Sequence, residues 1–356
     1  MALYLDASLR RTALPVTASP RTYIRSEEFD TTLLVAPLVA GLAAGAIVTA
    51  NARLYPILLL ADLWLLGYHH VVATYTRLAF DGQSLRRNRF LAVDLLLIVT
   101  AATLVVAMTA GAWVIASAFL YLQWFHYMRQ GYGIARMYFR ATPQGQAPTA
   151  RDWAADLVIY LVPVYGIAAR SATMGDQFLA LPVRTIVLPD PAITLLACLA
   201  GAAGLVWVGR TVRAALTDGV DLAYTLFIAS HITIFMMAYV VIADANAGWL
   251  CINVWHNFQY VLVVWMSNAK RYANGIDPSA RLLSRISQPG RVIAYFATCL
   301  AITTAVYFVI NQFTVVMLGG GLAVTVGIYM GINFHHYFVD ALIWKRRRVV
   351  ARPATA

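Results

Sequence analysis

The chain carries little charge for its length. Of its 356 residues only 12% are Asp, Glu, Lys or Arg, whereas 61% are hydrophobic. A soluble domain usually carries about 25% charged residues, so this chain cannot cover a globule of its size with solvated side chains. The shortage excludes an ordinary soluble enzyme and a disordered chain, and it indicates a polytopic membrane protein.

Cysteine and nucleotide-binding motifs are also scarce or missing. Cys198, Cys251 and Cys299 all lie in apolar runs and none forms a CxxC pair, which supports neither a disulfide framework nor a thiolate metal site. The chain has no GxGxxG and no Gly-x4-Gly-Lys, so we expect no bound flavin or nucleotide. Because residues 1–31 contain no leading apolar segment, we also expect no cleaved signal peptide.

Apolar runs of about 20 residues, the length that crosses a bilayer, dominate what is present. They cover residues 32–50, 55–77, 91–110, 112–136, 153–171, 191–209, 222–243, 248–267, 292–310 and 316–344. We therefore expect an all-α, polytopic transmembrane helix bundle of about ten spans. The chain divides into a cytoplasmic N-terminal segment (1–31), a transmembrane domain (32–344) and a basic cytoplasmic tail (345–356), and the stretch 279–285 is amphipathic enough to lie on the interface.

Basic residues account for the net charge of +11, and they gather in every second connection between the runs. The clusters are Arg10, Arg11, Arg21 and Arg25; Arg77, Arg86, Arg87 and Arg89; Arg136, Arg140 and Arg151; Arg210 and Arg213; Lys270, Arg271, Arg281, Arg285 and Arg291; and Lys345 to Arg348. The positive-inside rule then places both termini in the cytoplasm, for a bacterial protein at the inner membrane. We expect these cations to face anionic membrane lipids, and we expect no nucleic-acid partner.

All seven histidines fall inside the predicted spans. Helix rise places His70, His126, His231 and His336 about 10–15 Å from the cytoplasmic boundary, and His256 about 20 Å from it. An ionisable side chain within hydrocarbon is costly and indicates function. Helices of alternating direction would thus bring imidazoles to nearly one layer, on the cytoplasmic side.

Local spacing suggests that these imidazoles bind a metal. His69 and His70 are adjacent, as are His335 and His336, and Asp340 lies one helical turn after His336. Imidazole and carboxylate without thiolate suit iron, zinc, copper or nickel. The predicted ligands are His69, His70, His126, His231, His256, His335, His336 and Asp340. This set exceeds the three or four donors of one ion, so it predicts two ions or one ion with an extended outer shell.

Several polar residues allow two interpretations. His231 could equally make an ordinary hydrogen bond between helices, and Asp340 could pair with Lys345 instead of a metal. Asp62 would need a partner such as Arg53 or Arg170. We expect amide side chains near the histidines to hold the second nitrogen of each imidazole; these are Gln123, Gln130, Asn253, Asn257, Gln259 and Asn333. We expect Arg129 and Arg136 to anchor their helix at the interface or to bind an anionic substrate head group.

With these residues in view, the chain resembles the membrane-embedded, histidine-rich non-haem iron oxygenases, which include fatty-acyl desaturases, hydroxylases and alkane monooxygenases. The likeness is one of pattern, carried by His69-His70, His126, His256 and His335-His336, and the usual HxxxH and HxxHH boxes are absent. Membrane carotenoid-cleaving oxygenases are a looser likeness. The resemblance implies a di-iron centre that activates O₂ and attacks a C–H bond of a lipid or hydrocarbon.

The sequence therefore predicts a membrane oxidoreductase that uses iron, most plausibly two ions, and O₂ on a lipophilic substrate. Because no flavin or nucleotide motif is present, electrons would come from a separate cytoplasmic donor. Two alternatives stay open. A haem-binding electron-transfer protein would place two axial imidazoles on facing helices, and a metal or proton-coupled transporter would place its ligands near the midplane.

Overall fold

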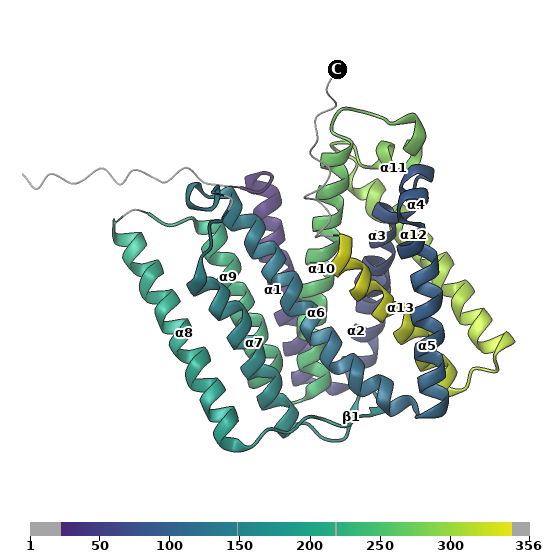
Figure 1. The fold of residues 1–356 in the computed structure, drawn as a ribbon, viewed down its shortest axis with the longest axis horizontal. Helices are drawn as coiled ribbons and strands as arrows, with labels where there is room; N and C mark the ends of the chain where they lie inside the picture. The colour runs from purple at the N-terminus through teal and green to yellow at the C-terminus, as the bar shows by residue number, and fades with distance from the viewer. Residues whose placement is uncertain (1–22, 148, 218, 344–356) are drawn as a thin grey trace, which may run out of the picture.

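The computed structural model describes residues 23–147, 149–217 and 219–343, and it is almost entirely helical (Figure 1). Ten long helical stretches make up the described residues: α1 (Glu27–Ala50); α2 (Tyr55–Asp62) running through η2 (Leu63–Gly67) into α3 (Tyr68–Leu78); α4 (Gly82–Arg89) running through η3 (Phe90–Asp94) into α5 (Leu95–Thr109); α6 (Ala112–Ala141); α7 (Trp153–Thr173); α8 (Asp190–Thr217); α9 (Leu222–Met236) with η5 (Met237–Val241); α10 (Ala245–Arg271); α12 (Val292–Gln312) with η7 (Phe313–Met317); and α13 (Leu322–Ile343). The expected all-α class is confirmed.

Short elements complete the fold. They are η1 (Ala52–Leu54), η4 (Pro143–Gly145), η6 (Pro278–Ala280), the helix α11 (Arg281–Ile286), and the antiparallel strands β1 (Gln177–Phe178) and β2 (Leu181–Pro182). Helix α11 overlaps the stretch 279–285 that the sequence marked as amphipathic. The predicted tail 345–356 and most of the predicted N-terminal segment lie outside the described residues.

Seven of the long stretches are apolar and long enough to cross a membrane, which indicates a membrane protein. They are α1, α2–α3, α4–α5, α7, α8, α9 with η5, and α12 with η7. Helices α6, α10 and α13, with 30, 27 and 22 residues, are not among them. These three helices carry four of the seven histidines, and α10 is buried along almost its whole length in the middle of the bundle (Figure 1).

The last predicted span was placed wrongly. The expected run 316–344 combines the end of η7 with α13, whereas the chain turns between them. Gly319 and Gly320 adopt left-handed φ angles of 73° and 63°, a conformation that glycine adopts without steric cost. The helix that carries His335 and His336 therefore begins only at Leu322.

Within the described residues, the π-helical segments η2 and η3 interrupt long helices and η5 and η7 end them, and the sequence analysis did not anticipate any of the four. Two of them lie where a neighbouring helix bonds to main-chain carbonyls. Arg170 of α7 donates to the carbonyls of Ala238 and Ile242 at η5, and His335 of α13 bonds the Leu91 carbonyl in η3. Irregular backbone inside a membrane bundle needs such partners, because hydrocarbon offers none.

Helix α1 packs closely on α10 through two small residues one turn apart. A Cβ added at Gly41 would lie 2.5 Å from the Cys251 carbonyl oxygen, and one added at Gly45 would lie 2.8 Å from the Cys251 Cβ. Small residues at this spacing allow two membrane helices to approach at backbone distance. This contact fixes α1 against the helix that carries His256.

We expect Gly41→Ala to lower the free energy of unfolding by about 1–3 kcal/mol, because the added methyl group forces α1 away from α10. The measurement is thermal unfolding of the purified protein in detergent. Gly209→Ala on α8 is the matched control, since an added Cβ there meets nothing within 4 Å. Equal unfolding temperatures for the two variants would contradict the close packing.

A buried carboxylate links the start of α4 to the end of α10. Asp81 accepts the Ser84 backbone N–H at 2.7 Å and the Arg271 guanidinium at 3.1 Å. Burial opposes ionisation of Asp81, but the hydrogen bonds from Ser84 and the charge of Arg271 outweigh it and hold its pKa below the ordinary value. The pair therefore connects the segment after α3 to α10 most firmly when Asp81 is charged.

A carboxyl group whose pKa is lower in the folded protein than in the unfolded chain stabilises the fold at pH values above its unfolded-state pKa. This contribution disappears as the pH falls below about 4. We expect Asp81→Asn to unfold at a lower temperature than the wild type at pH 7. The difference should shrink as the pH is lowered through this range. Thermal unfolding at several pH values tests it, and a difference that stays constant with pH would show that the charge of Asp81 is not involved.

Candidate metal centre

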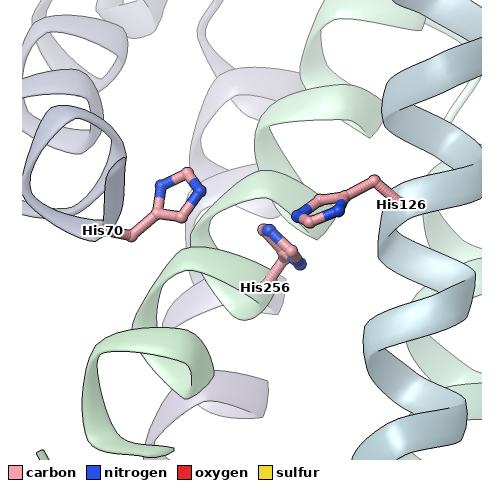
Figure 2. A group of neighbouring side chains, drawn as sticks. All are labelled: His70, His126 and His256. Carbon is pink, nitrogen blue, oxygen red and sulfur yellow. The ribbon is translucent and has the colours of Figure 1, made fainter. Parts of the chain in front are cut away.

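Four helices that are distant in sequence bring four imidazoles into contact. His70 lies on α3, His126 on α6, His256 on α10 and His336 on α13, and all four side chains are buried. Ring centroids are 4.5 Å apart for His70 and His336, 4.9 Å for His126 and His256, and 5.0 Å for His126 and His336. Figure 2 shows three of these rings, with those of His70 and His126 approaching that of His256 from opposite sides.

The π-helix η2 ends three residues before His70, the first of these residues. His70 Nδ1 lies 2.6 Å from the carbonyl oxygen of Gly67, the last residue of η2. A carbonyl can only accept a hydrogen bond, so Nδ1 carries the proton. The other nitrogen, Nε2, is then left with a lone pair that points away from α3 into the cluster.

A chain of hydrogen bonds fixes the protonation of His336 in the same way. Tyr260 donates its hydroxyl proton to Asp340 Oδ1 at 2.5 Å. Thr74 in turn lies 2.7 Å from the Tyr260 hydroxyl and 3.0 Å from His336 Nδ1. Thr74 also lies 3.3 Å from the His70 carbonyl oxygen. Since Tyr260 gives its proton to the carboxylate, the shorter contact requires Thr74 to donate to Tyr260, and Thr74 then accepts from His336 Nδ1. His336 Nε2 therefore also presents a lone pair.

The two lone pairs face each other. His70 Nε2 and His336 Nε2 are 2.9 Å apart within the buried cluster. Two acceptors at this distance repel unless a proton or a cation lies between them. Nitrogens that each bind one metal at about 2.0–2.1 Å stand about 2.9–3.4 Å apart for ligand angles of about 90–110°. The pair thus has the spacing of two ligands of one ion.

The surrounding donors complete the set. Asp340 Oδ2 lies 3.6 Å from His336 Nε2 and 4.0 Å from His126 Nε2. Candidate ligand atoms fall within 4.8 Å of one another in two overlapping groups, one of His70, His126 and His256 and one of His126, His336 and Asp340. The buried nitrogens His126 Nε2, His256 Nδ1 and His256 Nε2 have no hydrogen-bond partner within the described part of the chain. Each buried polar atom without a hydrogen-bond partner costs about 1–3 kcal/mol of stability. A metal ion bound among these residues fits as the missing partner.

The structure does not bring the other three histidines into this cluster. His335 is held between the Leu91 carbonyl, 2.7 Å from Nε2, and the Tyr75 hydroxyl, 3.4 Å from Nδ1. His231 Nε2 lies 3.2 Å from the Ile159 carbonyl, which is the helix–helix hydrogen bond that the sequence left open as its alternative role. His69 Nδ1 bonds the Leu65 carbonyl of its own helix.

The amides that were expected to hold the imidazoles form a separate network. Asn253 and Asn257 donate to Asp62 at 2.5 and 3.4 Å, and Tyr127 donates to Asn253. Asp62 therefore pairs with neither of the arginines that the sequence offered, and Arg170 bonds main-chain carbonyls instead. The network adjoins the cluster because the rings of Tyr127 and His256 are 4.4 Å apart.

Thr74 and the Gly67 carbonyl are the supporting groups that sequence reasoning missed. Thr74 follows His70 by four residues, a spacing that places both on one helix face and could have indicated it. No sequence signal identifies the Gly67 carbonyl, because its position depends on η2. Gln130, in contrast, bonds the His256 backbone carbonyl and not its ring.

No family model, no curated protein and no solved structure matches this chain.

We expect Tyr260→Phe to lower the free energy of unfolding of the metal-free protein by about 1–3 kcal/mol, because it removes the hydroxyl that donates to the buried Asp340. Thermal unfolding in detergent with a chelator present measures this. Tyr165→Phe, on α7 and outside the site, is the control. If both variants unfold like the wild type, the hydrogen-bond chain through Tyr260 does not hold the site.

Proposed function

We propose that this chain is a multi-pass membrane protein with ten spans and both termini in the cytoplasm. Ten long helical stretches among the described residues support the span count, including the three that are too polar to qualify by composition alone. The C-terminal ends of α3, α6, α8 and α10, near which the basic residues of the sequence gather, lie at one end of the bundle, the upper end in Figure 1, and the positive-inside rule assigns this end to the cytoplasm.

We infer that His70, His126, His256, His336 and Asp340 bind a redox-active first-row metal, with iron as the favoured ion. The observation that carries this proposal is the 2.9 Å separation of two imidazole nitrogens whose other nitrogens are already hydrogen-bonded. Four imidazoles and one carboxylate are an oxygen- and nitrogen-donor set that suits iron. All five residues are buried, which limits the competition from solvent ligands.

The predicted second ion receives less support. Three of the seven histidines lie outside the cluster, so the remaining five donors are enough for one ion and few for two. A second ion would need ligands from solvent or substrate. The stoichiometry of bound iron decides between the two cases.

The reaction we propose is oxidation of a lipophilic substrate by O₂, with electrons from a separate cytoplasmic donor, as in the oxygenases that the histidine pattern resembles. Bound iron would supply the capacity to activate O₂. The protein contributes orientation: Gly67 and Thr74 fix the imidazole tautomers, and Tyr260 holds a proton against Asp340 Oδ1.

The geometry argues against the haem alternative. Two axial imidazoles on one haem iron stand about 4 Å apart, with each nitrogen about 2 Å from the metal and the macrocycle between them. His70 and His336 are too close at 2.9 Å, and the rings of His126 and His256 occupy the adjoining space.

Elemental analysis of purified protein tests the metal centre. We expect near-stoichiometric iron in the wild type and at least a tenfold loss in His70→Ala and His336→Ala, since each removes a ligand. His231→Gln and His335→Gln, which lie outside the cluster, are matched controls and should retain iron. Equal metal content in all four variants would show that the imidazoles of the cluster only pack against one another and bind no metal.

Oxygen uptake tests the redox proposal separately. Protein loaded with ferrous iron under anaerobic conditions should consume O₂ faster than the same amount of free ferrous iron in the same detergent. His256→Ala should lose this acceleration together with its iron. Tight binding of iron without any acceleration would contradict the oxidoreductase proposal while leaving the metal site intact.

A further inference from the structure

A large cavity opens directly onto the candidate metal centre. It has a volume of about 1440 Å³ and lies between α6, α13 and the segment 149–151. Its lining includes His126, Tyr260 and Asp340, so an occupant would touch three members of the centre and its hydrogen-bond chain. Its volume exceeds the roughly 300–1,000 Å³ of typical ligand pockets and suits a long molecule.

Arginines line the same cavity. Arg129, Arg136, Arg140 and Arg151 all contribute to its wall, against one acidic lining residue, Asp340. Arg129, Arg136 and Arg140 follow His126 along α6 at intervals of 3, 10 and 14 residues, which is one face of a helix. Helix rise puts Arg136 about 15 Å and Arg140 about 21 Å along the axis from His126.

The cationic end has unfilled hydrogen-bonding capacity. Arg136 donates through Nη2 to the Ala150 carbonyl, whereas its Nη1 is buried without a partner within the described part of the chain. Asp156 on α7 is close enough to attract Arg136 and Arg151 electrostatically, and Asp152 already accepts from the Tyr224 hydroxyl and the Ala155 N–H. The four arginines of the cavity therefore still exceed the carboxylates beside them. An anionic oxygen would satisfy the free arginine N–H group.

The cavity has an apolar part as well. Leu122, Phe125 and Phe338 line it, and these residues are 41%, 47% and 51% exposed. These residues belong to the helices that we place in the membrane, so their exposed faces meet lipid. The cavity thus combines a cationic end, a passage beside His126, and a lateral opening to hydrocarbon.

We propose that this cavity binds an anionic amphiphile, whose carboxylate or phosphate head lies against Arg136 and Arg140 and whose apolar chain passes His126 and Asp340 towards Phe125. The statement that this amphiphile is the substrate of an oxygenase rests on the proposed function. Binding itself requires no metal, so it can be tested separately.

The experiment measures binding of single-chain amphiphiles to the full-length protein in phosphatidylcholine nanodiscs, with and without iron. Oleate and oleoyl lysophosphatidate are the anionic probes and distinguish a carboxylate head from a phosphate head. Oleyl alcohol and monooleoylglycerol are the neutral counterparts. We expect at least one anionic probe to bind about tenfold more tightly than its neutral counterpart, and we expect added salt to weaken this preference.

Gly133 offers a direct way to block the cavity. It lines the cavity between Arg136 and His126, and a Cβ added there meets no protein atom within 4 Å. Gly133→Leu should therefore fill the passage without displacing a neighbouring helix, and should weaken the anionic probe at least tenfold. Gly201→Leu on α8, which is equally open and lies outside the cavity, is the matched control.

The charge is tested by the double variant Arg136→Gln/Arg140→Gln, which should remove the preference for anionic probes. Arg213→Gln, an exposed arginine of α8 that does not line the cavity, should leave it unchanged. Equal binding of anionic and neutral probes, or unchanged binding in Gly133→Leu, would overturn the proposal. Because iron content is measured on the same samples, failure of the amphiphile site is distinguishable from failure of the metal centre.

Discussion

The close approach of two buried imidazole nitrogens, His70 Nε2 and His336 Nε2, is the constraint on which the site depends. Both nitrogens present lone pairs, because Gly67 and Thr74 take the protons on the opposite side of each ring. His70 and His336 are only 5% and 1% exposed, so little solvent reaches the two nitrogens to relieve this repulsion. The arrangement is stable only with a proton or a cation between the rings, and the unpartnered nitrogens of His126 and His256 beside them favour a cation.

The same constraint explains how the bundle is arranged. The helices that carry His126, His256 and His336 are too polar to qualify as membrane spans by composition alone. Burial among neighbours is how a membrane protein accommodates polar side chains, and α10, which carries His256, is buried along almost its whole length. The cavity beside α6 gives the centre a wide access.

Much of this organisation could be predicted from the sequence. Apolar runs located the long helices because hydrocarbon thickness fixes their length, and the common depth of the histidines indicated a shared site. The sequence could not separate His335 and His231 from the cluster, because this depends on which way each helix is rotated. That rotation is set by features with weak local signals: η2 before His70, the Leu91 carbonyl in η3, and the glycine turn before α13.

The most direct measurement of the central claim is an anomalous difference map at the iron absorption edge, collected from crystals of iron-loaded protein. The account predicts a strong peak among the rings of His70, His126, His256 and His336, within bonding distance of both facing Nε2 atoms. A map without a peak in this cluster, or with iron bound only at another place in the protein, would contradict it.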